Sequence, residues 1–405
     1  MKQKKPPSGG FFCSYTFLLF NKKRDFCLVK FVRILIKTIL GLAILVIVLA
    51  LIAQFTGNEY LIKGVRLTYL KGTNTANIYD GKDFDTRKVN RPAKAFHIPS
   101  AQQSVEIPEN LEQEFLETKT ASTILIQNDS VLWEKYYDVH NKTTLGNSFS
   151  AVKTMVCYLV QIAIQEGKIP SWESKAKDYL PWLKGPFSND VTLYNLASMS
   201  SGLDWEEAYT DPFCVTAKAY YGKDVVELMK GLEIVSKPGE GFRYQSGNTQ
   251  LLGIIISKIY KKPLAKVLEE KLWHPIGAES DATWNLDHEN GMELSYCCLS
   301  AVSRDFAKMG LLSLHEGNIN GIQVLDSSYV KRAIKAHFSP DYGIGYWRGN
   351  INDIKYHLFQ GHLGQFIAII PSKNAVFVRT GHQKKKSGPI PDCIRSYLKT
   401  VVELL

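Results

Sequence analysis

The longest uninterrupted apolar stretch lies near the start of this 405-residue chain. Residues 38–55, TILGLAILVIVLALIAQF, carry no charge, and Thr38 and Gln54 are their only clearly polar members. These 18 residues approach the roughly 20 that a helix needs to cross a bilayer. Arg33 and Lys37 can extend toward the headgroups and lengthen the effective span. The pattern therefore predicts one transmembrane helix.

A second apolar run contains a charge where none is expected. From Val152 to Ile164 the side chains are apolar almost all the way round a helix, yet Lys153 lies among them. A helix that is apolar on every side is normally buried. Burying an ammonium group without a partner is costly and favours its neutral form. Lys153 therefore needs a chemical explanation.

Strand patterns stand at both ends of the remaining sequence. Alternating residues around turn signals predict two β-hairpins, one at 122–139 and one at 365–381, and mostly helical signals occupy 165–335 between them. This order predicts an α+β fold. Its antiparallel sheet is built from both chain ends and covered by helices, and a helical domain is inserted in the middle. A cleft between the two parts is the expected place for a binding site.

Composition divides the chain into four parts. Residues 57–118 are polar with scattered Pro and Gly, as in a linker or a wrapped extension. The predicted parts are a basic segment at 1–37, the membrane helix at 38–55, a linker or N-terminal extension at 56–119, and a globular domain at 120–405 that contains the helical insertion at about 165–335.

The positive charge is concentrated ahead of the predicted membrane helix. The formal net charge is +10, and nine Lys and Arg residues against Asp25 give +8 before residue 38, which leaves +2 for everything after it. The excess therefore does not indicate a nucleic-acid-binding face. It predicts an N-terminus in the cytoplasm and residues from about 56 onward outside the membrane.

A cleaved signal peptide is the alternative reading of the same segment. Its basic region would be unusually long, and Leu51 and Ala53 fit a small-x-small cleavage site poorly, although residues 48–50 are acceptable. We therefore expect an anchor in the cytoplasmic membrane.

The cysteine pattern does not indicate a disulfide framework or a metal site. Five of the seven cysteines would lie outside the membrane, an odd number without metal-ligand spacing. Cys157 falls in the apolar helix and is expected in the core. We do not expect the neighbours Cys297 and Cys298 to bridge each other.

Ser150 offers the chemical explanation for Lys153. Three residues apart on a helix, the two side chains can share one face. A desolvated lysine near the positive end of the helix can become neutral and take the serine proton, and the helix N-terminus offers N–H groups to an oxyanion. Three further Ser-x-x-Lys pairs fall on stretches predicted to be at the surface or in the terminal helix: 174/177, 328/331 and 396/399.

Two later motifs could complete such a site. Tyr244 and Ser246 lie between a Pro-Gly loop and an apolar helix, where a tyrosine can relay protons if neighbouring cations lower its pKa. His362 and Gly364 stand directly before a strand, where the glycine lets a substrate approach the backbone and the Gln365 N–H could complete an oxyanion hole. Two similar patterns, at 315–317 and 379–381, are interpreted as unrelated to the site.

Ser-x-x-Lys, Tyr-x-Ser and His-x-Gly in this order resemble the serine β-lactamase and penicillin-binding-protein superfamily. The chain is most similar to the class C-like branch with esterases and 6-aminohexanoate-dimer hydrolases, from about residue 120 to the end. The flanking segments TLYNLASMSSGLDW, PGEGFRYQSGNTQLLG and GHLGQFIAIIP are similar too. The resemblance implies a serine β-lactamase-like fold and an acyl-enzyme mechanism without a metal or organic cofactor.

The same resemblance assigns a role to each motif. Ser150 would be the nucleophile and Lys153 its activator, and Tyr244 would be the general base and acid for the leaving group. The N–H groups of Ser150 and Gln365 would hold the oxyanion, and His362, Gly364 and Ser246 would contact the substrate.

Two positions depart from the superfamily pattern. Many members open the third motif with a lysine that helps bind a substrate carboxylate, where this chain has His362, and many have asparagine where this chain has Ser246. Both departures weaken the case for β-lactams or peptidoglycan stems as substrates, and neither affects the acylation machinery.

Three hypotheses follow from the sequence. The first is a membrane-anchored serine hydrolase that acts outside the cytoplasmic membrane on a small-molecule ester or amide and binds no nucleic acid. The second is a β-lactamase or D-amino-acid peptidase that acts on cell-wall material. The third is a catalytically silent binding protein of the same fold, and the intact set of Ser150, Lys153, Tyr244 and His362 argues against it.

Overall fold

The computed structural model describes residues 13–209, 211–385 and 388–405, and for residues 13–28 the backbone alone. The chain divides into two compact units, Met1–Ile62 and Lys63–Leu405. The first twelve residues of the predicted basic segment lie outside the described residues.

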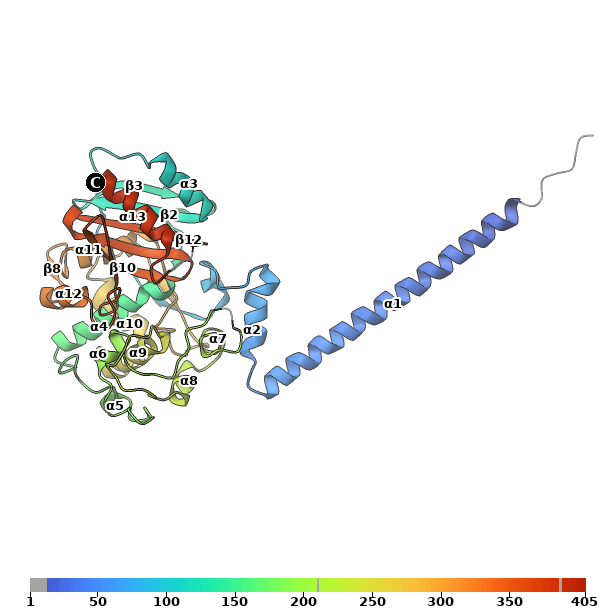
Figure 1. Ribbon diagram of the computed structural model, residues 1–405, viewed down its shortest axis with the longest axis horizontal. Helices are drawn as coiled ribbons and strands as arrows, with labels where there is room; N and C mark the ends of the chain where they lie inside the picture. The colour runs from blue at the N-terminus through green and yellow to red at the C-terminus, as the bar shows by residue number, and fades with distance from the viewer. Residues whose placement is uncertain (1–12, 210, 386–387) are drawn as a thin grey trace, which may run out of the picture. The chain divides into compact units, whose positions relative to one another are not determined.

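The first unit contains one long helix, α1 (Cys13–Phe55) (Figure 1). Its part Val29–Phe55 has 27 residues and contains an 18-residue window with a mean hydropathy of 2.9. It is the one helix within the described residues that is long and apolar enough to cross a membrane. This apolar part starts before the predicted span at 38–55. Its first turns contain Lys30, Arg33 and Lys37, but these bases are spaced among apolar residues. A signal sequence passes the same test of length and composition as a membrane anchor.

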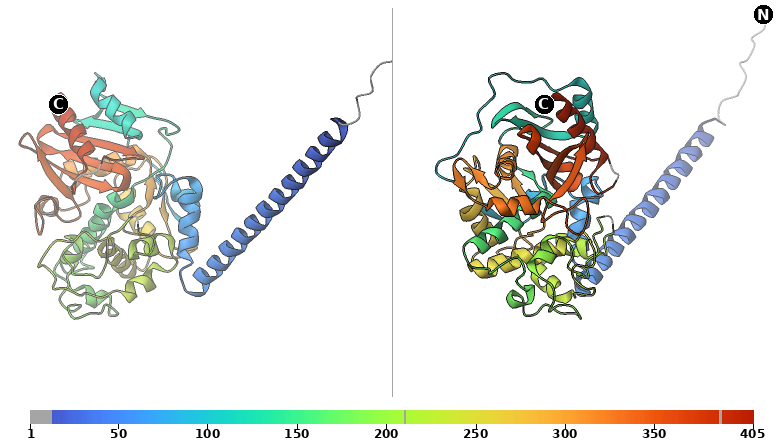
Figure 2. Two further views of the ribbon diagram at one scale, coloured as in Figure 1. Left: turned by 45° about the vertical axis from the view of Figure 1, so that its right-hand side comes forward. Right: turned by 60° about the vertical axis from the view of Figure 1, so that its left-hand side comes forward.

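The second unit is built around a six-stranded antiparallel sheet. The strand order is β3-β2-β12-β11-β10-β9. The bounds are β2 (Thr120–Gln127), β3 (Ser130–Tyr136), β9 (Trp347–Ile351), β10 (Ile354–Gly361), β11 (Gln365–Ile370) and β12 (Ala375–Gly381). The pairing of β2 with β12 joins the early and late parts of this unit, which Figure 2 shows as cyan beside red strands. The predicted sheet from both chain ends is confirmed.

The strands are apolar on both faces because helices cover both. On β2, Leu125 packs in one core with α3 (Glu109–Glu117) and α13 (Asp392–Leu404). Its neighbours Ile124 and Ile126 point to the other face, into the core that holds α4 (Val152–Gln165) and α11 (Ser303–Leu314). α4 lies between this face and α9 (Ser246–Tyr260), in the middle of the unit (Figure 1). An apolar helix in that place is buried on every side, as its sequence predicts.

The middle of the chain is helical, as expected, but it also contributes strands. Its further helices are α5 (Ala176–Tyr179), α6 (Leu193–Ala197), α7 (Val215–Tyr221), α8 (Val225–Gly231), α10 (Leu264–Leu268) and α12 (Ser327–Ala333). A second sheet has the order β1-β5-β6-β4, and β7 pairs with β8. The middle of the chain supplies β5 (Ala282–Asn285), β6 (Leu299–Ala301), β7 (Asn318–Ile319) and β8 (Ile322–Gln323), whereas β1 (Thr86–Val89) and β4 (Gly146–Asn147) precede it. They are too short to give an alternating pattern, which is why the sequence did not predict them.

Cys297 and Cys298 form a disulfide bond, so the expectation that these neighbours would not bridge is wrong. Cys298 has a positive φ of 75°, so the chain turns at the bridge instead of continuing extended. Trp284 supports the turn by donating its indole N–H to the Cys297 carbonyl at 2.8 Å. Cys157 is a buried free cysteine, as predicted for a core position.

Candidate active site

Ser150 and Lys153 lie at the start of the buried helix. Ser150 is in the single 3-10 turn Phe149–Ala151, which leads directly into α4. The Lys153 side chain is buried, with its residue 2% exposed, and its Nζ lies 3.0 Å from Ser150 Oγ. The structure therefore brings together the two residues that the helical spacing places on one face.

The ammonium group of Lys153 has three hydrogen-bond acceptors. Besides Ser150 Oγ, Nζ donates to Ser246 Oγ at 3.0 Å and to the Tyr296 carbonyl at 2.7 Å. Burial lowers the pKa of Lys153 to about 8, although the negative charge of Glu207 acts in the opposite direction. An ordinary lysine has a pKa near 10.4. A neutral amine is therefore accessible near neutral pH, and this explains how a lysine can lie within the apolar helix.

Tyr244 lies against this pair, on the loop before α9. Lys153 Nζ is 5.3 Å from the centre of the Tyr244 ring. Burial and then the negative charge of Glu207 raise the pKa of the phenol well above its ordinary value, while hydrogen bonding with Ser150 and Trp347 lowers it. The hypothesis that nearby cations lower this pKa is therefore wrong. The phenol therefore keeps its proton at neutral pH.

Glu207 is a member of the cluster that the sequence did not indicate. Its Oε1 accepts from the Ser246 hydroxyl and the Tyr209 hydroxyl, both at 2.6 Å. Its Oε2 accepts from the Ser246 backbone N–H at 2.7 Å and the Trp205 indole at 2.8 Å. Ser246 thus connects the carboxylate to Lys153. The acidic stretch around Glu207 shows no periodicity, so only the three-dimensional contact reveals this residue.

His362 forms another part of the wall, on the 3-10 turn His362–Gly364 between β10 and β11. Its Nε2 lies 2.8 Å from Thr75 Oγ1, and its ring stacks on Tyr209 with centroids 5.1 Å apart. Burial, and then the charge of Lys384, lower its pKa to about 4. The imidazole is therefore neutral at pH 7.

Gly364 and the Gln365 N–H make contacts in the structure that their motif did not predict. Gly364 has a φ of 83°, and a Cβ there would lie 2.7 Å from the guanidinium of Arg379. Its small size therefore accommodates Arg379, whereas the motif suggested room for a substrate. The Gln365 backbone N–H donates to the His362 carbonyl, so this N–H is occupied in the structure.

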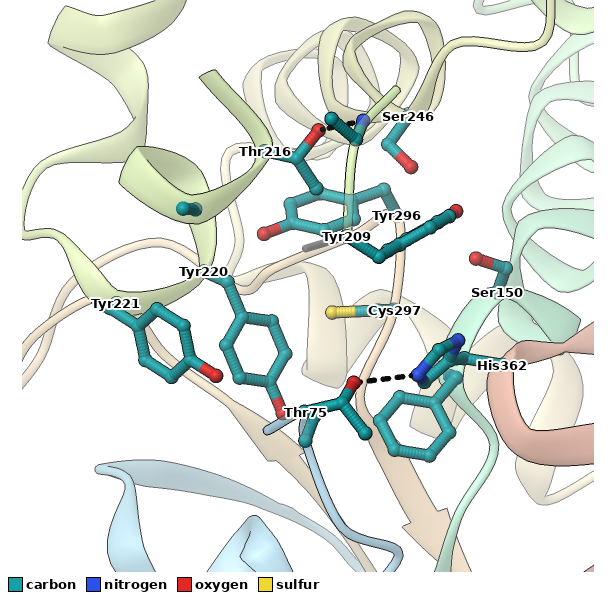
Figure 3. A pocket seen from close by; sticks show the side chains of 14 residues that line it. Thr75, Ser150, Tyr209, Thr216, Tyr220, Tyr221, Ser246, Tyr296, Cys297 and His362 are labelled. Atoms are coloured by element: carbon teal, nitrogen blue, oxygen red, sulfur yellow. Dashed lines mark hydrogen bonds between the residues drawn. The ribbon is translucent and has the colours of Figure 1, made fainter. Parts of the chain in front are cut away.

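A cavity of about 80 Å³ opens beside these residues. In Figure 3 the hydroxyls of Ser150 and Ser246 point toward its interior, and the dashed line joins His362 to Thr75. Aromatic side chains supply most of the remaining wall: Phe149, Tyr209, Tyr220, Tyr221 and Tyr296. Cys297 of the disulfide also lines it. Within the described residues, no three His, Cys, Asp or Glu side chains are grouped to hold a metal ion.

The other Ser-x-x-Lys pairs and the second His-x-Gly lie elsewhere. Lys177 bonds to Ser188, Lys331 pairs with Glu316, and Ser396 bonds to Glu114. His315 of the other His-x-Gly pairs with Asp129 at 2.6 Å. The interpretation of these pairs and of 315–317 as unrelated to the site agrees with these contacts. The same interpretation of 379–381 is wrong, because Arg379 donates to the carbonyls of Leu363 and Gly364 in the third motif.

Comparison with known families decides the group to which this chain belongs. The model of the family described as Beta-lactamase matches residues 109–392, which is more than half of the chain. The chain belongs to the beta-lactamase family. The predictions of the superfamily, the α+β fold and a serine hydrolase are thereby confirmed at the level of this family. The class C-like branch stays a prediction.

Individual proteins are similar to this chain over between 38% and 83% of its length. The 6-aminohexanoate-dimer hydrolase of Paenarthrobacter ureafaciens is 25% identical over 313 residues, 70% of this chain and 76% of that protein. A solved structure of a Bacillus anthracis protein described as a candidate 6-aminohexanoate-dimer hydrolase has a TM-score of 0.71 at 22% identity, and covers 83% of this chain and 93% of that one. Protein flp of Staphylococcus aureus is 28% identical over 167 residues, 38% of this chain and 33% of that protein.

Proposed function

We propose that this chain is a membrane-anchored serine hydrolase that cleaves an ester or amide bond of a small molecule through an acyl-enzyme on Ser150. The observation that carries the proposal is the buried Lys153 amine, 3.0 Å from Ser150 Oγ, with a pKa lowered to about 8. The relationship to a 6-aminohexanoate-dimer hydrolase, whose name indicates a linear amide substrate, supports the substrate class.

The geometry suggests a course for acylation. Neutral Lys153 accepts the proton of Ser150 as Oγ attacks the substrate carbonyl carbon. The N–H groups of Ser150 and Gln365 hold the oxyanion, which requires the Gln365 N–H to turn from the His362 carbonyl. Tyr244, which keeps its proton at neutral pH, donates it to the leaving alcohol or amine and regains one from Lys153. Water then cleaves the ester by the reverse transfers.

Anchoring is the second part of the proposal. The apolar helix Val29–Phe55 and the +8 charge ahead of residue 38 support a single span with the N-terminus inside and the catalytic domain, residues 120–405, outside. The extension at 56–119 supplies β1 and α3 to the same compact unit as the catalytic residues.

Covalent labelling tests the nucleophile. The unmodified chain is expected to react with a fluorophosphonate probe, and Ser150→Ala is expected to lose the label and all hydrolysis because the attacking oxygen is gone. Lys153→Ala is expected to lower the rate by roughly 10²–10⁴, the range for a positioned proton acceptor. Ser174→Ala, from a surface Ser-x-x-Lys pair, serves as the matched control. Labelling that survives in Ser150→Ala would contradict the assignment, and an unmodified chain that never labels would indicate a silent binding protein.

A further inference from the structure

Helix α2 (Tyr60–Leu67) and the short turn after it, Tyr69–Lys71, present apolar side chains to the outside. The inner side is packed: Leu67 is 2% exposed, and a Cβ on Gly64 would lie 3.4 Å from the ring of Tyr221. On the outer side Val65 is 46%, Tyr69 61% and Leu70 78% exposed. Val65 lies on α2, and Tyr69 and Leu70 lie on the turn that follows it.

This outer stripe, Val65, Tyr69 and Leu70, stands out from the rest of the second unit. Other large apolar side chains that are exposed in the described part of residues 63–405 are spread along the sequence: Leu116, Val139, Tyr209, Phe213, Val235, Ile322 and Leu404. Single exposed apolar residues are normal on soluble surfaces and need no partner. Three within six residues, on one short segment, indicate a surface that something apolar covers.

The surroundings of the stripe are basic. A groove beside it is lined by four bases, Lys63, Arg66, Lys71 and Lys82, against the two acids Asp83 and Asp85. Lys71 forms an ion pair with Asp83, and Lys63 lies 4.1 Å from the centre of the Phe84 ring. Apolar side chains flanked by Lys and Arg are the composition of a segment that lies in a membrane interface, where the bases meet lipid phosphates.

The length of the connecting chain also favours a bilayer. α1 ends at Phe55 and α2 begins at Tyr60, so only four residues separate them. The five Cα–Cα steps from Phe55 to Tyr60 span at most ~18 Å when fully extended. With Val29–Phe55 across a bilayer, the start of α2 cannot lie farther than that from the end of the span.

We propose that the outer stripe of Val65, Tyr69 and Leu70 inserts into the headgroup–acyl boundary of the bilayer that α1 crosses, with Arg66 and its basic neighbours facing lipid phosphates. The inference rests on the proposed anchoring. The same segment continues to Thr75, whose hydroxyl bonds to His362 in the pocket wall. Docking of the stripe therefore holds the catalytic pocket in a fixed orientation to the membrane surface instead of leaving it on a loose tether.

Depth-dependent fluorescence quenching tests the docking. The full chain is placed in nanodiscs of brominated phosphatidylcholine mixed with phosphatidylglycerol, with tryptophan introduced as Val65→Trp or Leu70→Trp. Val235→Trp, on an exposed loop, is the matched control because Val235 is also 46% exposed. After subtraction of the signal of the unmodified chain, the two stripe variants are expected to lose several-fold more fluorescence to brominated lipid than the control.

The outcomes separate the possible occupants. Equal quenching at positions 65, 70 and 235 would overturn the proposal, since it would mean no preferred docking face. In another outcome, brominated lipid does not quench the stripe tryptophans, and their emission shifts to the blue only at high protein density. That result would also overturn the proposal, and it would indicate that a second copy of the chain covers the stripe. A chain that does not enter nanodiscs at all would disprove the anchor itself, an outcome distinct from an anchored chain with an undocked stripe.

Discussion

Four neighbouring residues, and not the helix alone, determine how readily Lys153 binds a proton. The amine donates to Ser150, Ser246 and Tyr296, and three acceptors match the three N–H groups of an ammonium ion. Burial favours the neutral form, whereas Glu207 stabilises the charged form through Ser246. The balance of these two effects sets the pH at which Lys153 can accept a proton.

Removal of the Glu207 charge is expected to shift the pH profile of hydrolysis. Because the proposed acylation requires neutral Lys153, kcat/KM should rise with pH through the pKa of this residue, about 8. Glu207 raises that pKa, so Glu207→Gln lowers it and moves the rising limb to lower pH. The other titratable groups that face the amine, Cys157, Tyr244 and Tyr296, are unchanged in the variant. Initial rates of ester hydrolysis between pH 5 and 10 measure the limb.

Glu206→Gln provides the control for this experiment. Glu206 precedes Glu207 and is exposed to solvent, so Glu206→Gln removes the same charge outside the hydrogen-bonded cluster of Glu207, Ser246 and Lys153. Its pH profile is expected to match that of the unmodified enzyme. If Glu207→Gln lowers kcat/KM at every pH but leaves the rising limb at the same pH, Glu207 has a packing role alone.

At the residue scale, the sequence predicts contacts that follow a helical period and misses those that loops create. Ser150 and Lys153 could be paired because three residues on a helix bring side chains to one face. Glu207 could not, since nothing in a loop fixes its distance from Ser246, 39 residues further along the chain. The raised pKa of Tyr244 depends on burial by other segments, which its motif does not encode.

The turn between β10 and β11 is expected to affect which substrates fit the site. His362 is held by Thr75 and by the ring of Tyr209, and it carries no charge at pH 7. A neutral imidazole offers no charge-assisted contact to a substrate carboxylate. The enzyme is therefore expected to cleave short-chain esters readily, small linear amides more slowly, and penicillins and cephalosporins poorly.

His362→Lys is expected to move selectivity toward substrates that bear a carboxylate. A charge-assisted hydrogen bond is worth about 1.5–3 kcal/mol, which corresponds to roughly 10- to 150-fold in relative kcat/KM. The measurement compares matched esters with and without a carboxylate. His315→Lys, in the surface His-x-Gly, should leave the ratio unchanged. Turnover of a cephalosporin by the unmodified enzyme at the rate of its best ester would refute the argument.

At the element scale, long elements were predictable and short ones were not. The strands of the large sheet and the helices α4, α9 and α11 have enough residues to show a period. β4 has two residues and is a strand only because it pairs with β6, whose partner β5 in turn pairs with β1 from the extension. The bridge between Cys297 and Cys298 likewise depends on a backbone turn that the sequence does not encode in any recognisable way.

The distribution of charge determines how the whole molecule should lie across a membrane. The +8 excess precedes residue 38, whereas everything after that position carries +2. Lys and Arg near the end of a span are retained in the cytoplasm. A reporter enzyme that requires export, fused after Leu405, is therefore expected to be active, and one that requires the cytoplasm is expected to be silent.

Reversal of the charge asymmetry supplies the matched variant for this prediction. Exchanging the Lys and Arg residues ahead of residue 38 for Gln removes the retention signal but leaves the apolar helix Val29–Phe55 intact apart from Lys30, Arg33 and Lys37. The exported reporter should then lose activity, because the basic residues that follow the span, among them Lys63, Arg66 and Lys71, then favour the opposite orientation. Release of the reporter into the soluble fraction, with the first residues cleaved, would indicate a signal peptide instead of an anchor. A reporter active only in the cytoplasm in the unmodified chain would place the catalytic domain inside the cell and remove the argument for an external substrate.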